Sequence, residues 1–127
     1  MKRRVVVTGL GAVTPVGNTV KDMWDNIKQG KCGIDFITAF DTTDFKVKIA
    51  AEVKGFNPEE RIDKRAAKRM DRFTQFAVAA AKEAFKNAGL ENADFDRSRF
   101  GVLISSGIGG LATIESEHKK ALERGFD

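Results

Sequence analysis

The sequence has one cysteine, Cys32, and one histidine, His118, among its 127 residues. A lone cysteine excludes an internal disulfide, and one residue of each type cannot assemble a Cys/His zinc site. Apolar runs such as 5–7 and 102–104 are far too short to span a bilayer. The basic N-terminus, residues 1–4, runs through three valines straight into a Thr-Gly pair, which leaves no apolar region for a signal peptide. We therefore expect a cytoplasmic protein without a metal site or a membrane span.

Composition and charge bound the class of protein. Hydrophobic residues make up 42% of the chain and charged residues 31%, a balance typical of a soluble globular protein rather than a disordered one. The length suits one small domain and not two. The net charge of +4 is modest, but six basic residues and only two acids lie between Arg61 and Arg72. This local imbalance indicates an acidic partner.

A first helix is predicted to begin after Thr19. Thr19 and Asp22 have the spacing of a capping box, with Asp in the place of the usual Glu. Gly30 is predicted to end this helix. Its apolar residues recur at i, i+3, i+4 and i+7, namely Val20, Met23, Trp24 and Ile27.

Two aspects of the middle of the chain predict further helices. Asn57 followed by Pro58 and two acids is a strong helix start, because Asn caps, Pro suits the first helical position and acids face the positive end of the helix dipole. Asp71 is predicted to open a longer helix that runs to Asn87 and ends at Gly89. Five alanines on its buried stripe indicate a helix that lies close against a sheet.

Residues 111–124 are predicted to form a last helix, which Gly125 closes. Its apolar stripe includes His118, and a core or interface histidine is the usual finding at such a position. His118 therefore receives no catalytic assignment.

Two segments are predicted as strands buried on both faces. Residues 4–8 and 99–106 each carry three consecutive apolar residues without alternation, and each is followed by a glycine turn and a helix. Together they indicate an α/β layer with parallel strands. Residues 47–53 are a weaker extended segment, and residues 33–43 are predicted as a loop rich in Asp and Thr.

The number of predicted strands is small for such a layer. A parallel sheet covered on both faces normally has more than the two or three strands visible here. We therefore expect residues 1–127 to be a fragment. Its exposed sheet edge would make it marginally stable, or would cause it to self-associate or pair with a partner chain.

The glycines after the first predicted strand invite a dinucleotide-binding interpretation, because backbone amides at such a turn can approach a pyrophosphate. Gly9 and Gly11 fit the pattern, but Thr14 stands where the third glycine is required. No strand ends in a ribose-binding acid about 20 residues later. A strand-to-loop turn inside a packed layer is the better explanation. A nucleotide-dependent oxidoreductase is kept only as a hypothesis that adding NAD(P) would test.

Four motifs occur in order along nearly the whole chain: RRVVVTGLGAVTPVGN at 3–18, Gly33-Ile34 with Phe40-Asp41-Thr42, KRMD at 68–71, and SGIGG at 106–110. Together they resemble the opening part of the elongating β-ketoacyl-[acyl-carrier-protein] synthases, and TPVGN at 14–18 is closest to the synthase II branch. The resemblance implies a homodimer with a thiolase-like αβαβα fold, in which two similar α/β halves stack in five layers. Residues 1–127 would be the N-terminal portion of the first half, with an incomplete parallel or mixed sheet covered by helices and with the C-terminal half absent.

The resemblance also implies a chemistry. Such enzymes carry out a decarboxylative Claisen condensation, in which a cysteine thiolate takes the acyl chain from acyl carrier protein and two histidines help malonyl-carrier to lose carbon dioxide. The family places that cysteine and both histidines beyond Asp127, so we expect the fragment itself to be inactive. Cys32 lies in a glycine-rich helix exit and is interpreted as an inert loop thiol. No cofactor and no metal are implied.

The basic segment has its own interpretation. In one continuous helix over 61–72, four basic side chains spaced at i, i+4, i+7 and i+11 would share a face. The resemblance implies that the acidic acyl carrier protein docks here, on Arg65, Lys68 and Arg69, with Lys64 as a weaker candidate. A solvated helix face is the plain alternative. Nucleic acid is disfavoured, because two acids interrupt the stripe and no aromatic residues are interleaved with it.

The glycine cluster at 106–110 precedes a helix but lacks the Gly-Lys-Ser/Thr ending of a P-loop. The resemblance places this turn beside the acyl pocket, where Gly107 and Ile108 would lie and Ile108 would move to admit longer chains. A plain glycine turn with Ile108 in the core is the alternative.

Residues and resemblance together predict that the full-length protein is a 3-oxoacyl-[acyl-carrier-protein] synthase II of fatty acid biosynthesis, an acyltransferase. The alternative is a non-catalytic acyl-carrier-protein-binding module that keeps only the docking face. The preferred acyl chain length, and the choice between fatty acid and polyketide synthesis, stay open.

Overall fold

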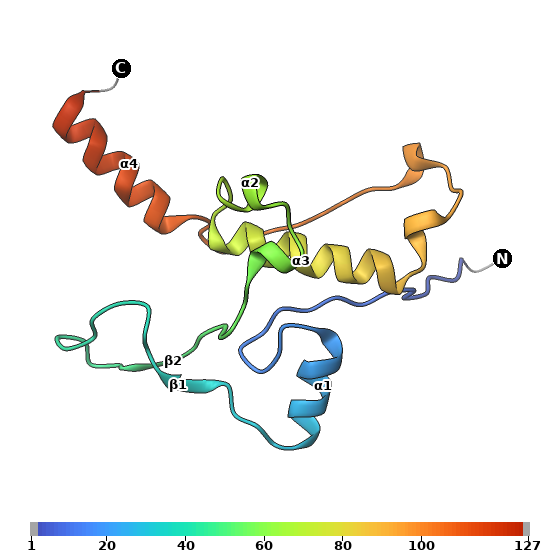
Figure 1. Ribbon diagram of the computed structural model, residues 1–127, viewed down its shortest axis with the longest axis horizontal. Helices are drawn as coiled ribbons and strands as arrows, with labels where there is room; N and C mark the ends of the chain where they lie inside the picture. Colours follow the sequence, from blue (N-terminus) through green and yellow to red (C-terminus); the bar gives the residue numbers. More distant parts are fainter. Residues whose placement is uncertain (1–2, 126–127) are drawn as a thin grey trace.

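The computed structural model describes residues 3–125, with the long helix α3 (Arg72–Asn87) at its centre (Figure 1). Helix α1 (Val20–Lys28) and the short helix α2 (Lys64–Ala67) lie near it, and α4 (Leu111–Arg124) extends away from the rest. A two-stranded antiparallel sheet pairs β1 (Ile34–Phe36) with β2 (Ile49–Ala51). Single 3-10 turns occur at η1 (Pro58–Glu60), η2 (Leu90–Asn92) and η3 (Arg97–Arg99). Within the described range, no helix has both the length and the apolar character needed to cross a membrane.

The predicted start and end of α1 are confirmed. The Thr19 hydroxyl oxygen accepts a hydrogen bond from the Asp22 amide at 3.0 Å, and the same hydroxyl donates to the Asp22 carboxylate at 2.7 Å. Gly30 has a φ of 68°, a left-handed conformation that favours glycine and ends the helix.

The predicted bounds of the two longer helices are also confirmed. Helix α3 begins directly after Asp71, and Gly89 follows its end with a φ of 71°. Helix α4 is followed by Gly125, whose φ is 89°. Asn57 caps η1 as predicted, since its side chain accepts a hydrogen bond from the Glu59 amide at 3.1 Å, but the helix that it opens is only one 3-10 turn.

The extended N-terminal segment lies directly on α3. A Cβ atom on Gly11 would clash with the carbonyl oxygen of Ala80, and one on Gly9 would clash with that of Ala84. Two glycines and the alanine stripe therefore allow the two backbones to approach closely. The stripe packs on an extended segment rather than on the predicted sheet. This close approach accounts for the glycines without a bound nucleotide.

The two segments predicted as buried parallel strands are extended but are not strands. Residues 4–8 and 100–106 have no ladder partner among residues 3–125, where the sheet is antiparallel. Their apolar side chains are exposed rather than buried, Val6 to 68% and Leu103 to 97%. The predicted parallel pairing is wrong for this part of the chain. An apolar run favours extended backbone, but a strand also needs a neighbour that pairs with its N–H and C=O groups.

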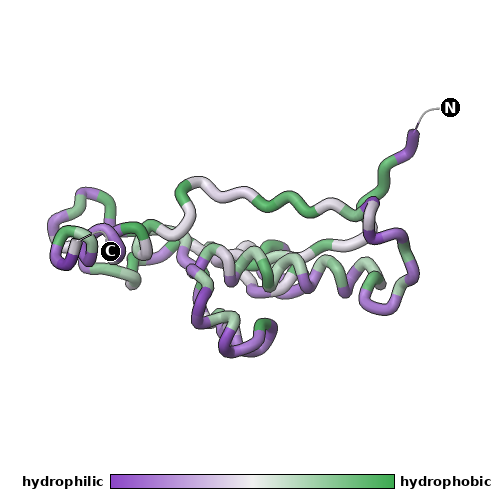
Figure 2. The backbone as a smooth tube through the Cα atoms, turned by 90° about the horizontal axis from the view of Figure 1, so that it is seen from above, coloured by the Kyte–Doolittle hydropathy of each residue, from purple (hydrophilic) through white to green (hydrophobic). Residues whose placement is uncertain are grey.

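The observed strands lie elsewhere. Strand β1 falls inside the predicted loop at 33–43, so the loop prediction is wrong for Ile34–Phe36. Strand β2 confirms the weaker extended segment at 47–53. Figure 2 shows hydrophobic residues along the extended segments beside α3, at a surface where no further strand of residues 3–125 covers them.

The core is small and sits where residues 56–67 pack on α3. Its buried apolar residues are Phe56, Ile62, Ala67 and Ala79, all less than 9% exposed. The Phe56 ring meets the Phe76 ring of α3 edge to face, with centroids 5.1 Å apart. The basic segment identified in the sequence therefore stands on the best-packed part of the chain.

Candidate functional site

Two aspartates divide the basic segment 61–72 into separate helices. The Asp63 carboxylate accepts hydrogen bonds at 3.0 Å from the amides of Arg65 and Ala66, and so caps α2. Helix α2 ends within four residues, and Asp71 then occupies the position before α3. The single continuous helix, with four basic residues on one face, is therefore wrong. Each aspartate starts a new helix and changes the direction of the chain.

Arg61 and Arg72, two members of the predicted face, make contacts with the rest of the fold, although Arg72 is exposed and Arg61 only partly buried. The Arg72 guanidinium lies over the rings of Phe76 and Phe56, 4.8 and 5.0 Å from their centroids, and donates to the Phe56 carbonyl at 3.4 Å. The Nη1 atom of Arg61 is buried. The backbone carbonyl oxygen of Arg61 accepts a hydrogen bond from the Lys82 ammonium at 2.8 Å. Both side chains are therefore engaged in contacts within the chain.

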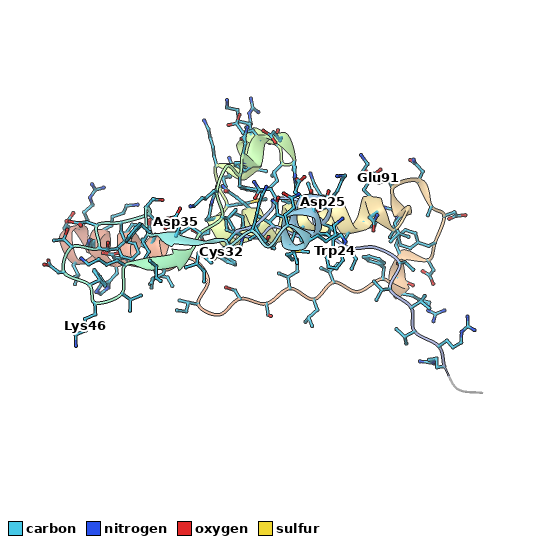
Figure 3. The ribbon with its side chains drawn as sticks, turned by 90° about the horizontal axis from the view of Figure 1, so that it is seen from below. Trp24, Asp25, Cys32, Asp35, Lys46 and Glu91 are labelled. Atoms are coloured by element: carbon cyan, nitrogen blue, oxygen red, sulfur yellow. The ribbon has the colours of Figure 1, made fainter. Side chains whose placement is uncertain are left out.

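The four residues predicted to dock a partner all lie on the surface. Lys64, Arg65, Lys68 and Arg69 are exposed. The Lys64 ammonium is 3.3 Å from the Glu59 carboxylate, whereas the other three form no ion pair with any residue in the described range. We call Arg65, Lys68 and Arg69 the basic surface. Figure 3 shows that the segment around α2 projects from the body of the molecule, with side chains directed outward.

The basic surface is held at a defined position by contacts with α3. Ala67, in the last turn of α2, is 3% exposed. The Gln75 side chain on α3 donates hydrogen bonds to the carbonyls of Ala67 and Met70, at 2.9 and 3.3 Å. These carbonyls flank Lys68 and Arg69. The arrangement offers three adjacent cations to carboxylates or phosphates without first breaking an internal ion pair.

The glycine turn at 106–110, predicted to lie beside a pocket, is closed by the side chain of its first residue, Ser106. The Ser106 hydroxyl oxygen accepts a hydrogen bond from the Gly109 amide at 2.9 Å, and Gly109 has a φ of 84°. Ile108, between them, is 73% exposed, so it is not part of the core. A Cβ atom on Gly107 would meet no described atom within 4 Å. The acyl-pocket role of Gly107 and Ile108 stays a prediction.

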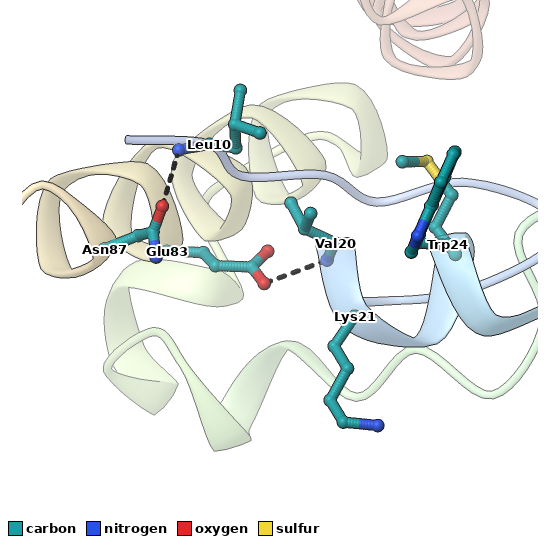
Figure 4. Close-up of a pocket in the computed structure, with 7 residues that line it drawn as sticks. Leu10, Val20, Lys21, Trp24, Glu83 and Asn87 are labelled. Carbon is teal, nitrogen blue, oxygen red and sulfur yellow. Dashed lines mark hydrogen bonds between the residues drawn. The ribbon is translucent and has the colours of Figure 1, made fainter. Parts of the chain in front are cut away.

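Glu83 and Asn87 on α3 are residues that the sequence analysis missed. The Glu83 carboxylate accepts a hydrogen bond from the Val20 amide at 2.9 Å, and the Asn87 side-chain oxygen accepts one from the Leu10 amide at 3.0 Å (Figure 4). The second Glu83 oxygen accepts a hydrogen bond from the Ala12 amide at 3.0 Å. The signal that could have identified them is their i, i+4 spacing beside the alanine stripe.

These two residues line the hollow shown in Figure 4, together with apolar side chains that include Trp24. Its volume is about 520 Å³. Because both Glu83 oxygens accept backbone amides, the carboxylate is a structural group that joins α3 to α1, not a general acid or base. Lys21, which also lines the hollow, pairs with the Asp25 carboxylate at 2.6 Å.

The lone cysteine and the lone histidine of the chain are both on the surface. Cys32 is exposed, and its sulfur accepts a hydrogen bond from the Ile34 amide at 3.4 Å and donates one to the Ile34 carbonyl at 3.9 Å. His118 is exposed on α4. Nothing in their surroundings supports a catalytic role for either residue.

Comparison with known proteins gives consistent matches. The family model described as "Beta-ketoacyl synthase, N-terminal domain" matches residues 2–126. The chain is 51% identical over 123 residues to 3-oxoacyl-[acyl-carrier-protein] synthase 2 of Staphylococcus aureus (strain N315), a match that covers 97% of this chain and 30% of that protein. It is 47% identical over 124 residues to the protein of the same name from Vibrio cholerae serotype O1, covering 98% of this chain and 30% of that one. The chain thus spans about a third of the length of these relatives.

Two solved structures match the fold over 98% of the chain, each with a TM-score of 0.76. One is the ishigamide ketosynthase/chain length factor, 30% identical and covered over 31% of its length. The other is a type II PKS acyl-carrier protein in complex with its ketosynthase bound to the hexaketide, 28% identical and covered over 33%. The predicted fold class, the first part of a thiolase-like α/β fold, is confirmed by these ketosynthase matches.

Proposed function

Because this chain belongs to the β-ketoacyl synthase family, whose N-terminal domain it matches over residues 2–126, we propose that the full-length protein is a 3-oxoacyl-[acyl-carrier-protein] synthase of the synthase II branch. It would condense an acyl chain with malonyl-carrier by decarboxylative Claisen condensation, in fatty acid biosynthesis. Residues 1–127 would form the N-terminal portion of its first domain. The cysteine and the two histidines of the chemistry would lie outside these residues, so this portion alone would be inactive. We also propose a cytoplasmic homodimer.

The observation that carries this proposal is the basic surface of Arg65, Lys68 and Arg69. Six basic residues lie between positions 61 and 72: Arg72 lies over a phenyl ring, Arg61 has one buried guanidinium nitrogen, and Lys64 forms an ion pair. The remaining three stand exposed on a segment that Gln75 holds against α3. An acidic protein can pair with them at little cost in rearrangement, which favours fast and specific association.

The partner proposed for the basic surface is acyl carrier protein, which is acidic. One of the two matched structures is an acyl-carrier protein in complex with its ketosynthase, which supports this partner class. On this proposal, residues 64–69 would receive the carrier, and the turn at 106–110 would lie beside the pocket that receives the acyl chain.

Charge reversal in the full-length protein tests the proposal. Lys68→Glu and Arg69→Glu should each weaken the binding of acyl carrier protein by about tenfold at low salt, because a favourable charge contact becomes a repulsive one. The matched control is Lys46→Glu, an exposed lysine in the loop between β1 and β2 (Figure 3). This control should leave the Kd within about twofold. Equal effects of all three variants would mean that net charge alone governs binding, and the docking assignment would be withdrawn.

A turnover assay separates the synthase from a non-catalytic carrier-binding module. The full-length protein, given an acyl-carrier and malonyl-carrier, should release carbon dioxide and form a 3-oxoacyl-carrier two carbons longer. Carrier binding without this product would instead identify the binding module.

A further inference from the structure

The carboxylate of Asp71 joins the start of α3 to the start of α4. One oxygen accepts a hydrogen bond from the Thr113 hydroxyl in the first turn of α4. The other lies so close to Gly110 that a Cβ atom there would clash with it. Asp71 occupies the N-cap position of α3 but makes no side-chain capping bond to that helix. Its carboxylate is therefore committed to the turn and to α4 rather than to its own helix.

The turn between Ser106 and Gly110 is fixed on both sides of Ile108. On one side, the Ser106 hydroxyl oxygen accepts the Gly109 amide at 2.9 Å. On the other, the Phe73 ring would lie 3.7 Å from a Cβ atom on Gly109, and the Asp71 carboxylate abuts Gly110. Ile108 itself is 73% exposed and has little packing of its own. Asp71 and Phe73 therefore stand next to Gly110 and Gly109, the two residues that directly follow Ile108.

We propose that Asp71 is a positioning residue that sets acyl chain-length selectivity, because it holds the turn from which Ile108 projects. This inference rests on the proposed synthase function and on the predicted place of Ile108 at the acyl pocket. With the Asp71–Thr113 bond intact, the Ile108 side chain meets a growing acyl chain from a fixed backbone, and long chains must displace it. Without that bond the whole turn can yield, and the difference between short and long chains becomes smaller.

The test uses Thr113→Val in the full-length protein, because valine keeps the shape of threonine and removes only the hydroxyl group. The measurement is kcat/KM for a short-chain and a long-chain acyl-carrier, together with the Kd of the carrier. We expect the ratio of the two kcat/KM values to change by about fivefold to tenfold, the size of effect that small changes in an apolar pocket produce. The carrier Kd should stay within about twofold, because Thr113 is not part of the basic surface.

Two matched variants accompany it. Thr113→Ser keeps the hydroxyl and should restore the wild-type ratio. Ser116→Ala removes a different hydroxyl of α4, one that donates to the Thr113 carbonyl at 2.9 Å, and should leave the ratio unchanged. Asp71→Ala should reproduce the effect of Thr113→Val; if it does not fold, the exposed Thr113 variants decide the question alone.

The outcomes distinguish a failure of the role proposed for Asp71 from a failure of the proposed synthase function. If Thr113→Val lowers kcat/KM equally for both chain lengths, or changes neither, Asp71 is only a structural residue and the inference is overturned. If the wild-type protein neither binds carrier nor condenses acyl chains, the proposed function fails, and the inference falls with it.

Discussion

The carboxylate of Glu83 accepts a hydrogen bond from the backbone amide of Val20 at 2.9 Å, although the two residues are 63 positions apart in sequence. Val20 is the first residue of α1, where unpaired amides and the positive end of the helix dipole favour an anion. The second carboxylate oxygen accepts the Ala12 amide at 3.0 Å. One side chain on α3 therefore holds both α1 and the segment that leads to it.

We predict that Glu83→Gln opens this junction locally. Glutamine keeps one acceptor oxygen but presents an NH₂ group to the other amide, so one charge-assisted hydrogen bond is lost. Such bonds contribute about 1.5–3 kcal/mol when partly buried. The amides of Val20 and Ala12 should exchange with deuterium about tenfold or more faster, a change that hydrogen exchange of the full-length protein would measure directly.

The matched control is Glu123→Gln on α4, a glutamate for which the structure of residues 3–125 shows no side-chain hydrogen bond. It should leave exchange at Val20 and Ala12 unchanged. Unaltered protection in Glu83→Gln as well would show that the glutamate does not hold α1 in solution.

Local signals explain why the helices could be predicted from the sequence. Thr19 and Asp22 lie three residues apart and bond to each other, and Gly30 takes a left-handed φ immediately after the helix. These interactions depend only on residues within one or two turns. The same is true of Gly89 at the end of α3. The local sequence therefore holds all the information that these helix ends require.

Non-local pairing explains why the strands could not be placed. The three valines at 5–7 favour extended backbone, but whether they form a strand depends on a partner that the local sequence does not name. Strand β1, with the polar Asp35 at its centre, is a strand because Ile49–Ala51 pairs with it in register. A short strand of this kind is defined by its partner more than by its own composition.

The basic segment shows the same division between local and non-local information. Arg65, Lys68 and Arg69 are exposed, and their docking role stays a prediction, whereas the continuous helix considered for residues 61–72 does not form. The helix start at Asp71 was predicted from the sequence, but the capping of α2 by Asp63 was not, because there Asp63 counted only as a charge that opposes the basic segment. Glu83 was missed because its partners, Ala12 and Val20, are distant in sequence.

The loop between β1 and β2 should respond to acid through Glu52. Its carboxylate accepts hydrogen bonds from the Thr38 hydroxyl at 2.8 Å and from the amides of Thr38 and Ala39 at 3.0 and 3.1 Å. These bonds, the hydroxyl first, lower the pKa of Glu52 below its ordinary value of 4.5. The stabilisation is therefore complete above pH 4.5 and is lost as the pH falls through the lower pKa of the folded state.

An NMR titration that follows the Thr38 amide checks the lowered pKa of Glu52. Its midpoint should lie below pH 4.5 in the wild-type protein, and Thr38→Val should move the midpoint of Glu52 upward, because valine lacks the hydroxyl that contributes most to the shift. In Glu52→Gln the titration of the Thr38 amide should disappear. A wild-type midpoint at or above 4.5 would mean that the carboxylate does not engage this loop in solution.

Arg65 and Arg72 look alike in the sequence, but the structure predicts opposite consequences for their substitution. Both arginines are exposed, but the Arg72 guanidinium lies over the rings of Phe56 and Phe76, whereas Arg65 on α2 has no ion pair in the described range. Arg72→Gln should therefore cost about 0.5–1 kcal/mol of stability, the size of an exposed cation–π contact. Arg65→Gln should cost less than about 0.5 kcal/mol, as surface substitutions usually do.

For carrier binding the order of the two effects should be reversed: Arg65→Gln should have the larger effect and Arg72→Gln the smaller. Arg65→Gln should weaken the binding of acyl carrier protein severalfold at low salt and reduce the dependence of the Kd on ionic strength, because an exposed cation of the docking surface is lost. Arg72→Gln, measured well below its melting temperature, should change that salt dependence less, because its guanidinium is held over two phenyl rings and is less free to reach a partner. Thermal melts and binding titrations of the same two full-length variants give both comparisons. If Arg72→Gln altered the salt dependence as much as Arg65→Gln, the division of the basic segment into inward and outward residues would be wrong, and the docking surface would have to include the first turn of α3.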